Sequence, residues 1–472
     1  DVETVKKMIK KNQAEYSSFL ASCKVARNYY KNKTDILLQS KKADNDNNPL
    51  RNADNRIPLN FHGLLVNQKA SYMYTSPPIF DLGSGNANKA LSRFLGDKYA
   101  KVCKDLCIEA SNCSVGWIHL WNTKGNGLKY AVVPAEQIVP IFSKNLEKEL
   151  IGVLRTYQDF SDDGEALTVY EYWDDKVCQS YHVRAGGSFD DDFVSNPVFN
   201  VVDNTGEAFV TSEFEHGIGE VPFFHFFNNN IDSGDLDNIK PLIDSYCKVI
   251  SGFVNDLEDI QEVIFVLTDY GGTSLNGFLQ DIKKYKVIQL DSDGPDDKSD
   301  ARMLSIEIPV EARKELMKIM RQCIFEQGQG IDPDPQNFGN SSGVALSFLY
   351  SLLELKAGLQ ETEFKLGFGR FIRCVCRLMG ILIKNDTIVQ TWTRTSVRND
   401  KEIADICNQS DGILSTETIV EHHPYVDDPA KEMERLEEQQ RADEAAQKEI
   451  SDMFPQSEKK PEELKDKEEG DA

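Results

Sequence analysis

Apolar residues recur at helical spacing in the first part of the chain and predict three helices. The first covers residues 1 to about 40, and a polar run over residues 41–55 separates it from the second, Arg56–Thr75. The third covers Asn88–Ala110. Their apolar positions lie three and four residues apart, so each helix should pack one face into a core.

From Ser114 the apolar residues alternate with polar ones, which is the period of a half-buried strand. Turns rich in Gly and Asp separate the runs, so we predict an antiparallel sheet in an α+β domain. The runs are Val115–Trp121, Leu128–Val133, Leu150–Tyr157, Leu167–Trp173 and Val177–Val183. Their aromatic residues should form core and cross-strand pairs, because no basic residues interleave with them as a base-stacking surface requires. These residues are Trp117, Trp121, Tyr170, Tyr172 and Trp173.

Residues 236–267 predict one long helix, because their apolar positions alternate steps of four and three. The opposite face is acidic. This combination suits a bundle or a ring of like helices, and an ordinary helix on the core of its own domain is the alternative. The seam consists of Tyr246, Ile250, Phe253, Leu257, Ile260 and Ile264.

Two further helices flank a loop unlike the rest of the sequence. The first, around Pro309–Glu326, should end at Gly328 and Gly330, where a left-handed backbone costs little. The second opens at Ser341 and runs for about 40 residues, or ~60 Å.

The loop between these helices contains Pro333 and Pro335, which exclude a helix there. No Lys or Arg occurs from Gln322 to Leu355. We interpret the loop as a segment that the long helices present.

The remaining segments are shorter. Residues 268–308 should form a small α/β insert at the far end of two long helices. The end of the chain, from Glu432, is charged and should be mostly solvated, with a disordered terminus. After Ile383 we predict a strand and two helices, at Thr387–Thr395, Lys401–Asn408 and Ser415–His422.

Composition limits the function. The 472 residues carry a net charge of −24, so the chain should not grip nucleic acid by neutralising phosphates. No apolar run is long enough to span a membrane, and no signal-peptide pattern occurs. The ten cysteines form no CxxC pair, which indicates reduced thiols rather than a metal site.

Two glycine motifs do not indicate nucleotide binding. Gly339–Gly343 opens a helix but lacks the Lys of a phosphate-binding loop. Gly367–Arg370 lies inside a helix rather than after a strand, so it is not a dinucleotide fingerprint. The acidic clusters come without a paired His and nucleophile. We therefore expect no enzyme activity, no cofactor and no metal.

Several motifs resemble the portal proteins of long-tailed double-stranded DNA phages. They keep their order over most of the chain, and the matches between residues 234 and 349 are the most specific. The motifs are Asn55–Phe61, Ser76–Pro78, Gly234–Tyr246, Tyr270–Thr273, Tyr285–Ile288, Ile308–Arg313, Asn337–Leu346 and Tyr425–Pro429. Because the chain begins at Asp1, an N-terminal extension is expected to be missing.

The resemblance implies a mostly helical portal fold with an antiparallel-sheet wing, long stem helices, a small α/β clip and a helical crown. It implies a homo-oligomeric ring, as a dodecamer, at one vertex of the capsid, through which double-stranded DNA passes. Implied partners are the terminase large subunit, a head-completion or adaptor protein, and the major capsid and scaffolding proteins, with no membrane. The implied location is the virion, and the host cytoplasm during assembly. The expected domains are wing 1–235, stem helix 236–267, clip 268–308, second stem helix 309–327, tunnel loop 328–343, long wing helix and strands 344–398, crown 399–450 and acidic tail 451–472.

The resemblance also assigns roles to residues. The seam residues listed above become contacts between stem helices of neighbouring subunits. The tunnel loop facing the DNA contains Gly330, Asp332, Pro333, Asp334, Gln336, Asn337, Phe338 and Asn340. The clip docking surface contains Tyr270, Gly271, Gly272, Asp291, Asp293 and Asp296.

The acidic composition agrees with a conduit, because a wall that bound DNA tightly would stall its passage. The alternatives are an ATP-driven motor subunit, which the missing phosphate-loop Lys disfavours, and a monomeric scaffold or adhesin with a long hairpin. Another subunit of a phage head or packaging assembly is the broader alternative.

Overall fold

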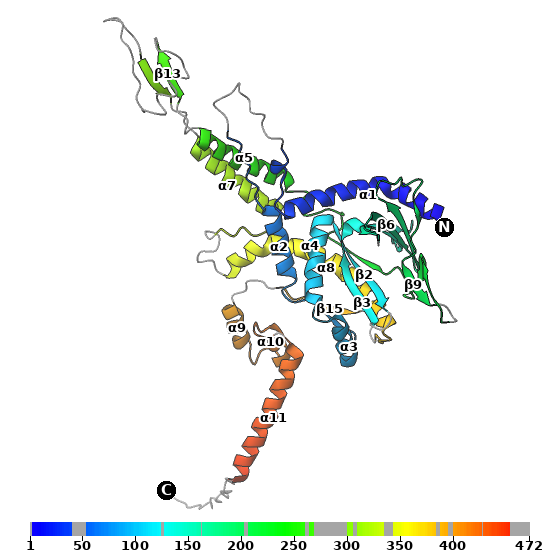
Figure 1. Ribbon diagram of the computed structural model, residues 1–472. Helices are drawn as coiled ribbons and strands as arrows, with labels where there is room; N and C mark the ends of the chain where they lie inside the picture. The colour runs from blue at the N-terminus through cyan, green and yellow to red at the C-terminus, as the bar shows by residue number, and fades with distance from the viewer. Residues whose placement is uncertain are drawn as a thin grey trace, which may run out of the picture. The chain divides into compact units, whose positions relative to one another are not determined.

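The computed structural model describes residues 2–39, 53–123, 127–161, 163–202, 206–259, 264–268, 300–304, 309–334, 343–383, 388–394, 400–426 and 428–453. The chain divides into two compact units (Figure 1). Unit 1 comprises Asp1–Gly339 and Phe348–Ser396, and unit 2 comprises Asn340–Ser347 and Val397–Ala472. Helices occur together with antiparallel sheets, which confirms the predicted α+β class.

Unit 1 is built around helices α2 (Phe61–Met73), α4 (Tyr99–Cys113) and α8 (Gly343–Leu378). Helix α2 begins where the Asn60 side chain accepts a hydrogen bond from the Gly63 amide, which satisfies one free N–H group of the first turn. Helix α1 (Val2–Tyr30) precedes a short 3-10 helix, η1 (Asp35–Leu37). Helix α3 covers Gly85–Leu95.

Two sheets form the β part of unit 1. The three-stranded sheet has the order β12 (Phe223–Phe227), β2 (Val115–Thr123), β3 (Gly127–Val133). The six-stranded sheet has the order β11 (Glu213–Glu215), β7 (Val177–Arg184), β6 (Ala166–Trp173), β5 (Leu150–Phe160), β4 (Ile138–Phe142), and β8 (Val194–Ser195) also pairs with β7. The predicted strand runs are therefore confirmed, and Trp117 and Trp173 are buried in the core as expected.

Helix α8 packs directly onto strand β12. A Cβ atom on Gly367 would lie 2.6 Å from a ring carbon of Phe226, so only glycine permits this approach. Phe364, Phe368 and Phe371 of α8 are fully buried on the same side. The glycine motif in α8 is thus explained by packing between helix and sheet.

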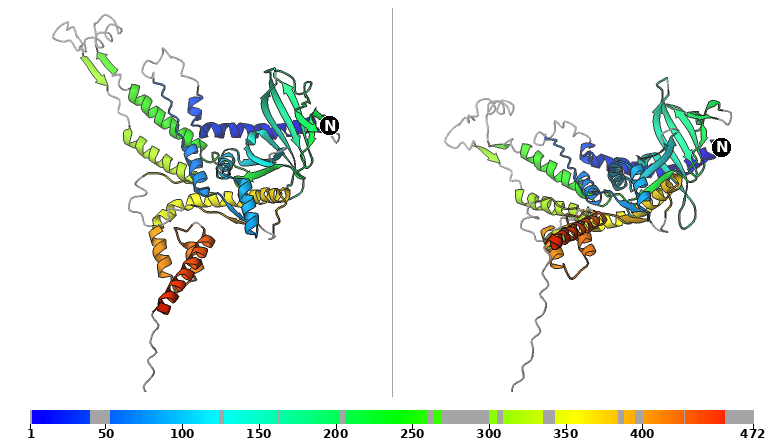
Figure 2. Two further views of the ribbon diagram at one scale, coloured as in Figure 1. Left: turned by 60° about the horizontal axis from the view of Figure 1, so that its bottom comes forward. Right: turned by 90° about the horizontal axis from the view of Figure 1, so that it is seen from below.

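Helices α5 (Lys240–Asp259) and α7 (Val310–Gln327) run side by side (Figure 2). Strand β13 (Ile264–Thr268) pairs with β14 (Asp300–Leu304) in an antiparallel arrangement. The other short elements of unit 1 are β1 (Ile79–Asp81) paired with β15 (Val389–Thr391), β9 (Phe199–Val202) paired with β10 (Ala208–Thr211), and the 3-10 helix η2 (Ala135–Gln137). Unit 2 contains α9 (Asp400–Gln409), α10 (Thr416–His422) and α11 (Pro429–Met453).

Three predicted helices differ from the structure. The helix expected from residue 1 to about residue 40 ends at Tyr30, and the short 3-10 helix η1 follows it. The helix expected over Asn88–Ala110 is two helices, α3 and α4, because the backbone of Gly96 turns into the left-handed region with φ 62°. The helix expected over residues 236–267 ends at Asp259, and Ile264 already belongs to a strand. Apolar residues continue at helical spacing into that strand, so periodicity alone could not separate the two elements.

Strands β4 and β12 and the length of α11 were not predicted. The sequence of β12, Phe-Phe-His-Phe-Phe, is an unbroken aromatic run, which shows no alternation of apolar and polar residues. The charged stretch from Glu432 lies within a helix that reaches Met453. Most of the α/β insert lies outside the described residues.

Candidate functional site at the end of helix α7

Helix α7 ends in a Schellman motif. The amide of Gly330 donates to the carbonyl of Phe325 at 2.9 Å, and the amide of Gln329 donates to the carbonyl of Glu326 at 3.2 Å. The residue in the left-handed region is Gln329, with φ 51°. The prediction that the glycines supply the left-handed position was therefore wrong.

Gly328 and Gly330 are needed for a different reason. A Cβ atom on Gly330 would lie 2.0 Å from the side chain of Leu65 in α2, and one on Gly328 would lie 2.6 Å from the same leucine. Real Cβ atoms do not approach other atoms so closely. The two glycines let the end of α7 press against α2.

The backbone carbonyl and amide groups of the next residue, Ile331, both form hydrogen bonds with one side chain. Gln68 of α2 donates from Nε2 to the Ile331 carbonyl at 2.6 Å, and the Ile331 amide donates to Gln68 Oε1 at 3.1 Å. The side-chain amide thus replaces the partner strand that this short extended segment lacks.

Asp332 forms an ion pair with Arg321, which lies outside the loop. Arg321, three turns back in α7, donates from Nε to Oδ2 at 2.9 Å and from Nη2 to Oδ1 at 2.5 Å. The hydrogen bonds to Asp332 raise the pKa of Arg321. The same carboxylate accepts a hydrogen bond from the Asp334 amide at 3.2 Å. This two-pronged pair fixes the direction of the chain as it leaves α7.

A buried charged cluster lies behind the helix end. Lys69 of α2 is 2.7 Å and Lys356 of α8 is 3.1 Å from the same oxygen of Asp235, whose side chain is 4 % exposed. Lys356 also donates to the Gly328 carbonyl at 2.9 Å. A cavity of about 70 Å³ adjoins the cluster. One ammonium group therefore joins α8 to the last carbonyl groups of α7, where the helix dipole favours a cation.

Two side-chain amides complete this cluster. Asn228 donates from Nδ2 to Asp235 and accepts from both Lys69 and Gln360 at Oδ1. Gln360 of α8 in turn accepts a hydrogen bond from the thiol of Cys107 in α4. The network thus connects α2, α4, α8 and the segment after β12.

The pKa values in the cluster depend on the ion pairs between Asp235 and the two lysines. Burial opposes the charge on Asp235, but the ammonium groups of Lys356 and Lys69 outweigh it and hold the pKa of Asp235 well below its ordinary value. Burial lowers the pKa of Lys356, although Asp235 counteracts this effect. One carboxylate is paired with two lysines, so the removal of any one of the three groups changes the environment of the other two.

The predicted site residues are only partly brought together. Gly330, Asp332, Pro333 and Asp334 form the first part of the loop just described. The structure does not describe the other four predicted loop residues, Gln336, Asn337, Phe338 and Asn340, or any of the six predicted clip residues, Tyr270, Gly271, Gly272, Asp291, Asp293 and Asp296.

The residues of the predicted stem seam differ in burial and in secondary structure. Tyr246 is buried in the core of its own chain, with its ring 5.2 Å from that of Phe61. Ile250 and Phe253 are half-buried, and the Arg313 guanidinium lies over the Phe253 ring. Leu257 is 48 % exposed. Ile260 lies outside the described residues, and Ile264 is in β13, which removes it from the helical seam.

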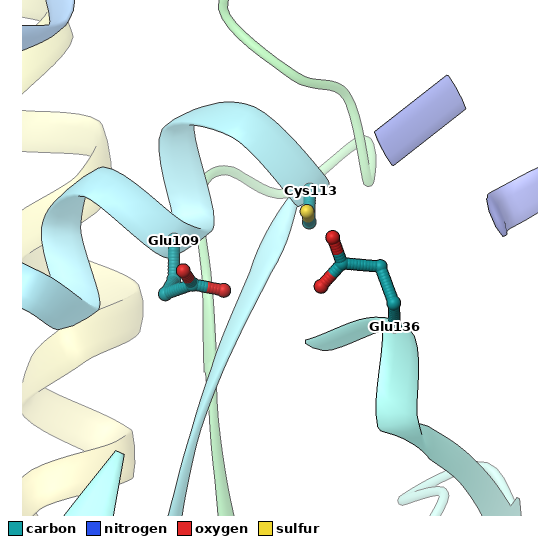
Figure 3. Close-up of side chains that lie close together, drawn as sticks. All are labelled: Glu109, Cys113 and Glu136. Atoms are coloured by element: carbon teal, nitrogen blue, oxygen red, sulfur yellow. The ribbon is translucent and has the colours of Figure 1, made fainter. Parts of the chain in front are cut away.

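One group of potential metal ligands occurs among the described residues: Glu109, Cys113 and Glu136 (Figure 3). The guanidinium of Arg27 in α1 occupies the space between the two carboxylates, and its Nη2 donates to Glu109 at 2.6 Å and to Glu136 at 2.7 Å. The guanidinium pairs with both acids and offsets one of their two charges. The arrangement is an ion pair between α1, α4 and η2 rather than a metal centre.

Sequence reasoning missed the residues that hold the loop. Gln68, Lys69, Arg321 and Lys356 lie on three helices far apart in the chain, and their pairing depends on the fold. Two signals were available: Lys69 is the one residue of α2 that is Asp, Glu, Lys or Arg, and Asp235 lies within the segment Gly234–Tyr246, one of the matched motifs. In the part of the chain that the structure describes, no helix has the length and apolarity to cross a bilayer.

Comparisons with known proteins identify the family. The chain matches the family model "Phage portal protein, SPP1 Gp6-like" over residues 9–446. It is 39 % identical over 451 residues to the portal protein of Clostridium phage phiCD119, which covers 92 % of this chain and 95 % of the relative. It is 28 % identical over 398 residues to the portal protein of Bacillus phage SPP1, which covers 82 % of this chain and 76 % of the relative.

A solved structure, the neck of a native GTA particle computed with C12 symmetry, aligns with a TM-score of 0.43 and 11 % identity, over 76 % of this chain and 88 % of that one. A likeness of this size supports no conclusion of its own. The family model, which spans most of the sequence, and the phiCD119 relative are sufficient. The chain belongs to the family of SPP1 Gp6-like phage portal proteins.

Proposed function

We propose that the chain is one subunit of a ring that conducts double-stranded DNA through one vertex of a phage head. The ring, as a dodecamer, would serve genome packaging, the joining of head and tail, and genome ejection. Membership of the portal family supports this role. The observation on which we rest the proposal is the fixed start of the loop after α7, held by Gln68, Arg321 and Lys356.

A loop with a fixed start can act as a collar at a set position in a channel. Gln336, Asn337, Phe338 and Asn340 are the proposed contacts with DNA. Asp332 is excluded from this role, because Arg321 already neutralises it. With a net charge of −24 the subunits repel phosphate, so contact with DNA is steric and brief rather than a tight grip.

Subunit contacts in the proposed stem fall on the α5–α7 pair. Leu257, Leu316 and Ile319 are each about half exposed there. Of the predicted seam, Ile250, Phe253, Leu257 and Ile260 stay as candidates, and Leu316 and Ile319 join them. Large apolar side chains at this exposure are normal singly, but a cluster on two adjacent helices indicates an interface.

The remaining assignments rest on the family. The segment between α5 and α7 would be the clip, which docks first the terminase large subunit and then a head-completion or adaptor protein. The capsid and scaffolding proteins would contact the wing. For the wing and the other domains we propose the bounds that the resemblance implies. The family is structural rather than catalytic. We propose assembly in the host cytoplasm and a final place in the virion.

The test is a pair of measurements on purified protein. Negative-stain images should show rings for the wild type and for a variant with Gln336–Asn340 replaced by two glycines, because the fixed start of the loop is retained. In a packaging assay the shortened loop should reduce the length or the retention of packaged DNA. Normal packaging would show that the loop does not face the DNA.

Absence of rings in the wild type would contradict the portal role itself. ATP hydrolysis by the purified protein would instead favour a motor subunit. A stable monomer that binds other head proteins would favour a scaffold.

A further inference from the structure

Two lysines in the body of unit 1 share a single buried carboxylate. The side chains of Lys69 and Asp235 are 1 % and 4 % exposed, and that of Lys356 is 12 % exposed. When both lysines are paired as ammonium groups, the three side chains carry one excess positive charge. A buried charge without a counter-charge is costly, so the excess has to be offset or given up.

Other groups of the chain offset this excess only in part. Among the described residues, no carboxylate other than that of Asp235 lies within ion-pair distance of either lysine. His62 and Cys107 adjoin the cluster, but burial lowers the pKa of His62 and raises that of Cys107 to about 11, so neither is negative at neutral pH. The carbonyl groups at the end of α7 act as about half a negative charge.

A cavity of about 70 Å³ opens beside the cluster. Its only charged lining residues in the described part of the chain are Lys69, Lys356 and Asp235, and the rest of the lining is mostly side-chain amides, such as those of Gln327 and Gln329. One water molecule needs about 10–15 Å³ of such space, whereas pockets for organic ligands measure about 300–1,000 Å³. The cavity therefore admits a small ion with a few waters and excludes a nucleotide or a peptide.

Each ammonium group has a hydrogen-bond donor to spare. Of the three N–H groups on its Nζ, Lys69 uses one for Asn228 Oδ1 at 2.8 Å and one for Asp235 at 2.7 Å. Lys356 uses one for the Gly328 carbonyl at 2.9 Å and one for Asp235 at 3.1 Å. The third N–H of each has no partner among the described residues. Both nitrogens lie beside the same oxygen of Asp235, so one ion can reach both.

We propose that this cavity binds one small inorganic anion of single charge, of the size of chloride, between the ammonium groups of Lys69 and Lys356. Water would satisfy the two spare N–H groups but would leave the excess charge. An anion of two charges would exceed it. Gln327 and Gln329, whose side chains have no hydrogen-bond partner in the described part of the chain, supply further donors. The site lies within one subunit and does not depend on the proposed ring.

The bound anion acts on the end of α7 through Lys356. Because this ammonium group also holds the Gly328 carbonyl, an ion that fixes it stabilises the junction of α2, α7 and α8. The alternative response to the excess charge is the loss of a proton from Lys356, whose pKa burial lowers. A neutral Lys356 would leave nothing for an anion to offset, so the two responses differ in their dependence on chloride.

The experiment measures the melting temperature of the full-length chain in chloride. Chloride replaces gluconate, which is too large for the cavity, at constant ionic strength from about 3 mM to about 300 mM, and an ion that binds only the folded chain should raise the melting temperature by about 3 °C or more. Hydrogen exchange at the Gly330 amide should slow over the same range. Phosphate at equal concentration should give a smaller rise.

Two variants separate this site from general effects of salt. Lys356→Met removes the excess charge and keeps the pair of Lys69 with Asp235, so it should lose the dependence on chloride. Lys365→Met is the matched control on the same helix, because that lysine is 44 % exposed and pairs with Glu361. It should keep the wild-type dependence.

A direct measurement needs no variant. In crystals of the wild type grown with bromide in place of chloride, an anomalous scattering peak should lie within hydrogen-bond reach of Nζ of both Lys69 and Lys356. Absence of that peak would overturn the inference, as would equal chloride dependence in the wild type and Lys356→Met. A larger rise with phosphate than with chloride would refute the single charge of the ion. None of these outcomes bears on the proposed portal role.

Discussion

At its start, α7 meets α5 through the Arg313–Asp256 ion pair and the contact of Arg313 with the Phe253 ring, while Leu316 and Ile319 stay about half exposed. At its end, Ile324 and Phe325 are buried in the core. Charged and polar contacts from three helices surround that end. The start of α7 therefore has few buried contacts, whereas its end is packed into the core.

The difference concerns where movement is possible. Segments with few buried contacts open locally at low free-energy cost, whereas segments tied into the core open only with the whole domain. The outer part of the α5–α7 pair can thus open locally at low free-energy cost. The end of α7 cannot, so the start of the loop keeps its position relative to α2 and α8.

Among the variants that test the difference between the two ends of α7, Asp235→Asn should have the largest effect. The substitution leaves Lys69 and Lys356 buried without a counter-charge, and removing one partner of a buried pair costs about 3–5 kcal/mol. Urea unfolding should show this loss. Asp232→Asn, at an exposed carboxylate three residues earlier, is the control and should change stability by less than about 0.5 kcal/mol. An equal effect of both variants would mean that the cluster does not hold the end of α7.

Lowering the pH should remove the contributions of Asp235 and of two buried histidines to stability over different pH ranges. The pKa of Asp235 is lower in the folded chain, so its contribution is complete above its unfolded value near 3.9 and is lost as pH falls further. Burial also lowers the pKa of His119 to about 4 and that of His225 to about 3. Their contributions are complete above the unfolded value near 6.5 and are lost as pH falls towards 4 and 3.

We therefore expect two stages of acid destabilisation in unfolding experiments from pH 8 to pH 3. The Asp235→Asn variant should keep the loss that comes from the histidines, between about 6.5 and 3, and should show a smaller further loss below about 4 than the wild type. A variant with the wild-type dependence below about 4 would rule out Asp235 as the group responsible.

Gly330→Ala should have an intermediate effect. The added Cβ would overlap Leu65, and overpacking of a well-packed site costs about 1–3 kcal/mol. Gly252→Ala in α5 is the matched control, because a Cβ there meets nothing within 4 Å, and it should be neutral or stabilising by up to about 1 kcal/mol. The double variant Gly330→Ala/Leu65→Ala should lose less stability than the sum of the two single losses if the overlap is the cause.

The smallest expected effect distinguishes the two arginines of α7. The Arg321 side chain is 36 % exposed, so solvent screening limits its pair with Asp332 to about 1 kcal/mol or less. Arg321→Ala should nevertheless speed hydrogen exchange at the Ile331 amide, because the chain leaves α7 less firmly held. Arg313→Ala should speed exchange in the first turns of α7 and leave Ile331 unchanged. The opposite pattern would reverse the proposed order of the two ends.

Much of this arrangement could be predicted from the sequence. The long apolar period of α8, the alternation in β5, β6 and β7, and the loop bounded by glycines are local patterns. The role of Gly328 and Gly330 was not predictable, because it depends on Leu65, more than two hundred residues earlier. The end of α5 was misplaced for a related reason: Ile264 continues the helical spacing, and only pairing of β13 with β14 makes it part of a strand.

The ten cysteines of the chain are all free, and all but Cys323 are buried. Burial raises the pKa of Cys103 to about 12, of Cys107 to about 11 and of Cys374 to about 12, so at neutral pH these thiols are almost wholly uncharged. Thiol reagents react with the thiolate form. A single cysteine introduced at the exposed Leu146 could therefore carry a fluorophore or a cross-linker selectively in a Cys323→Ser background.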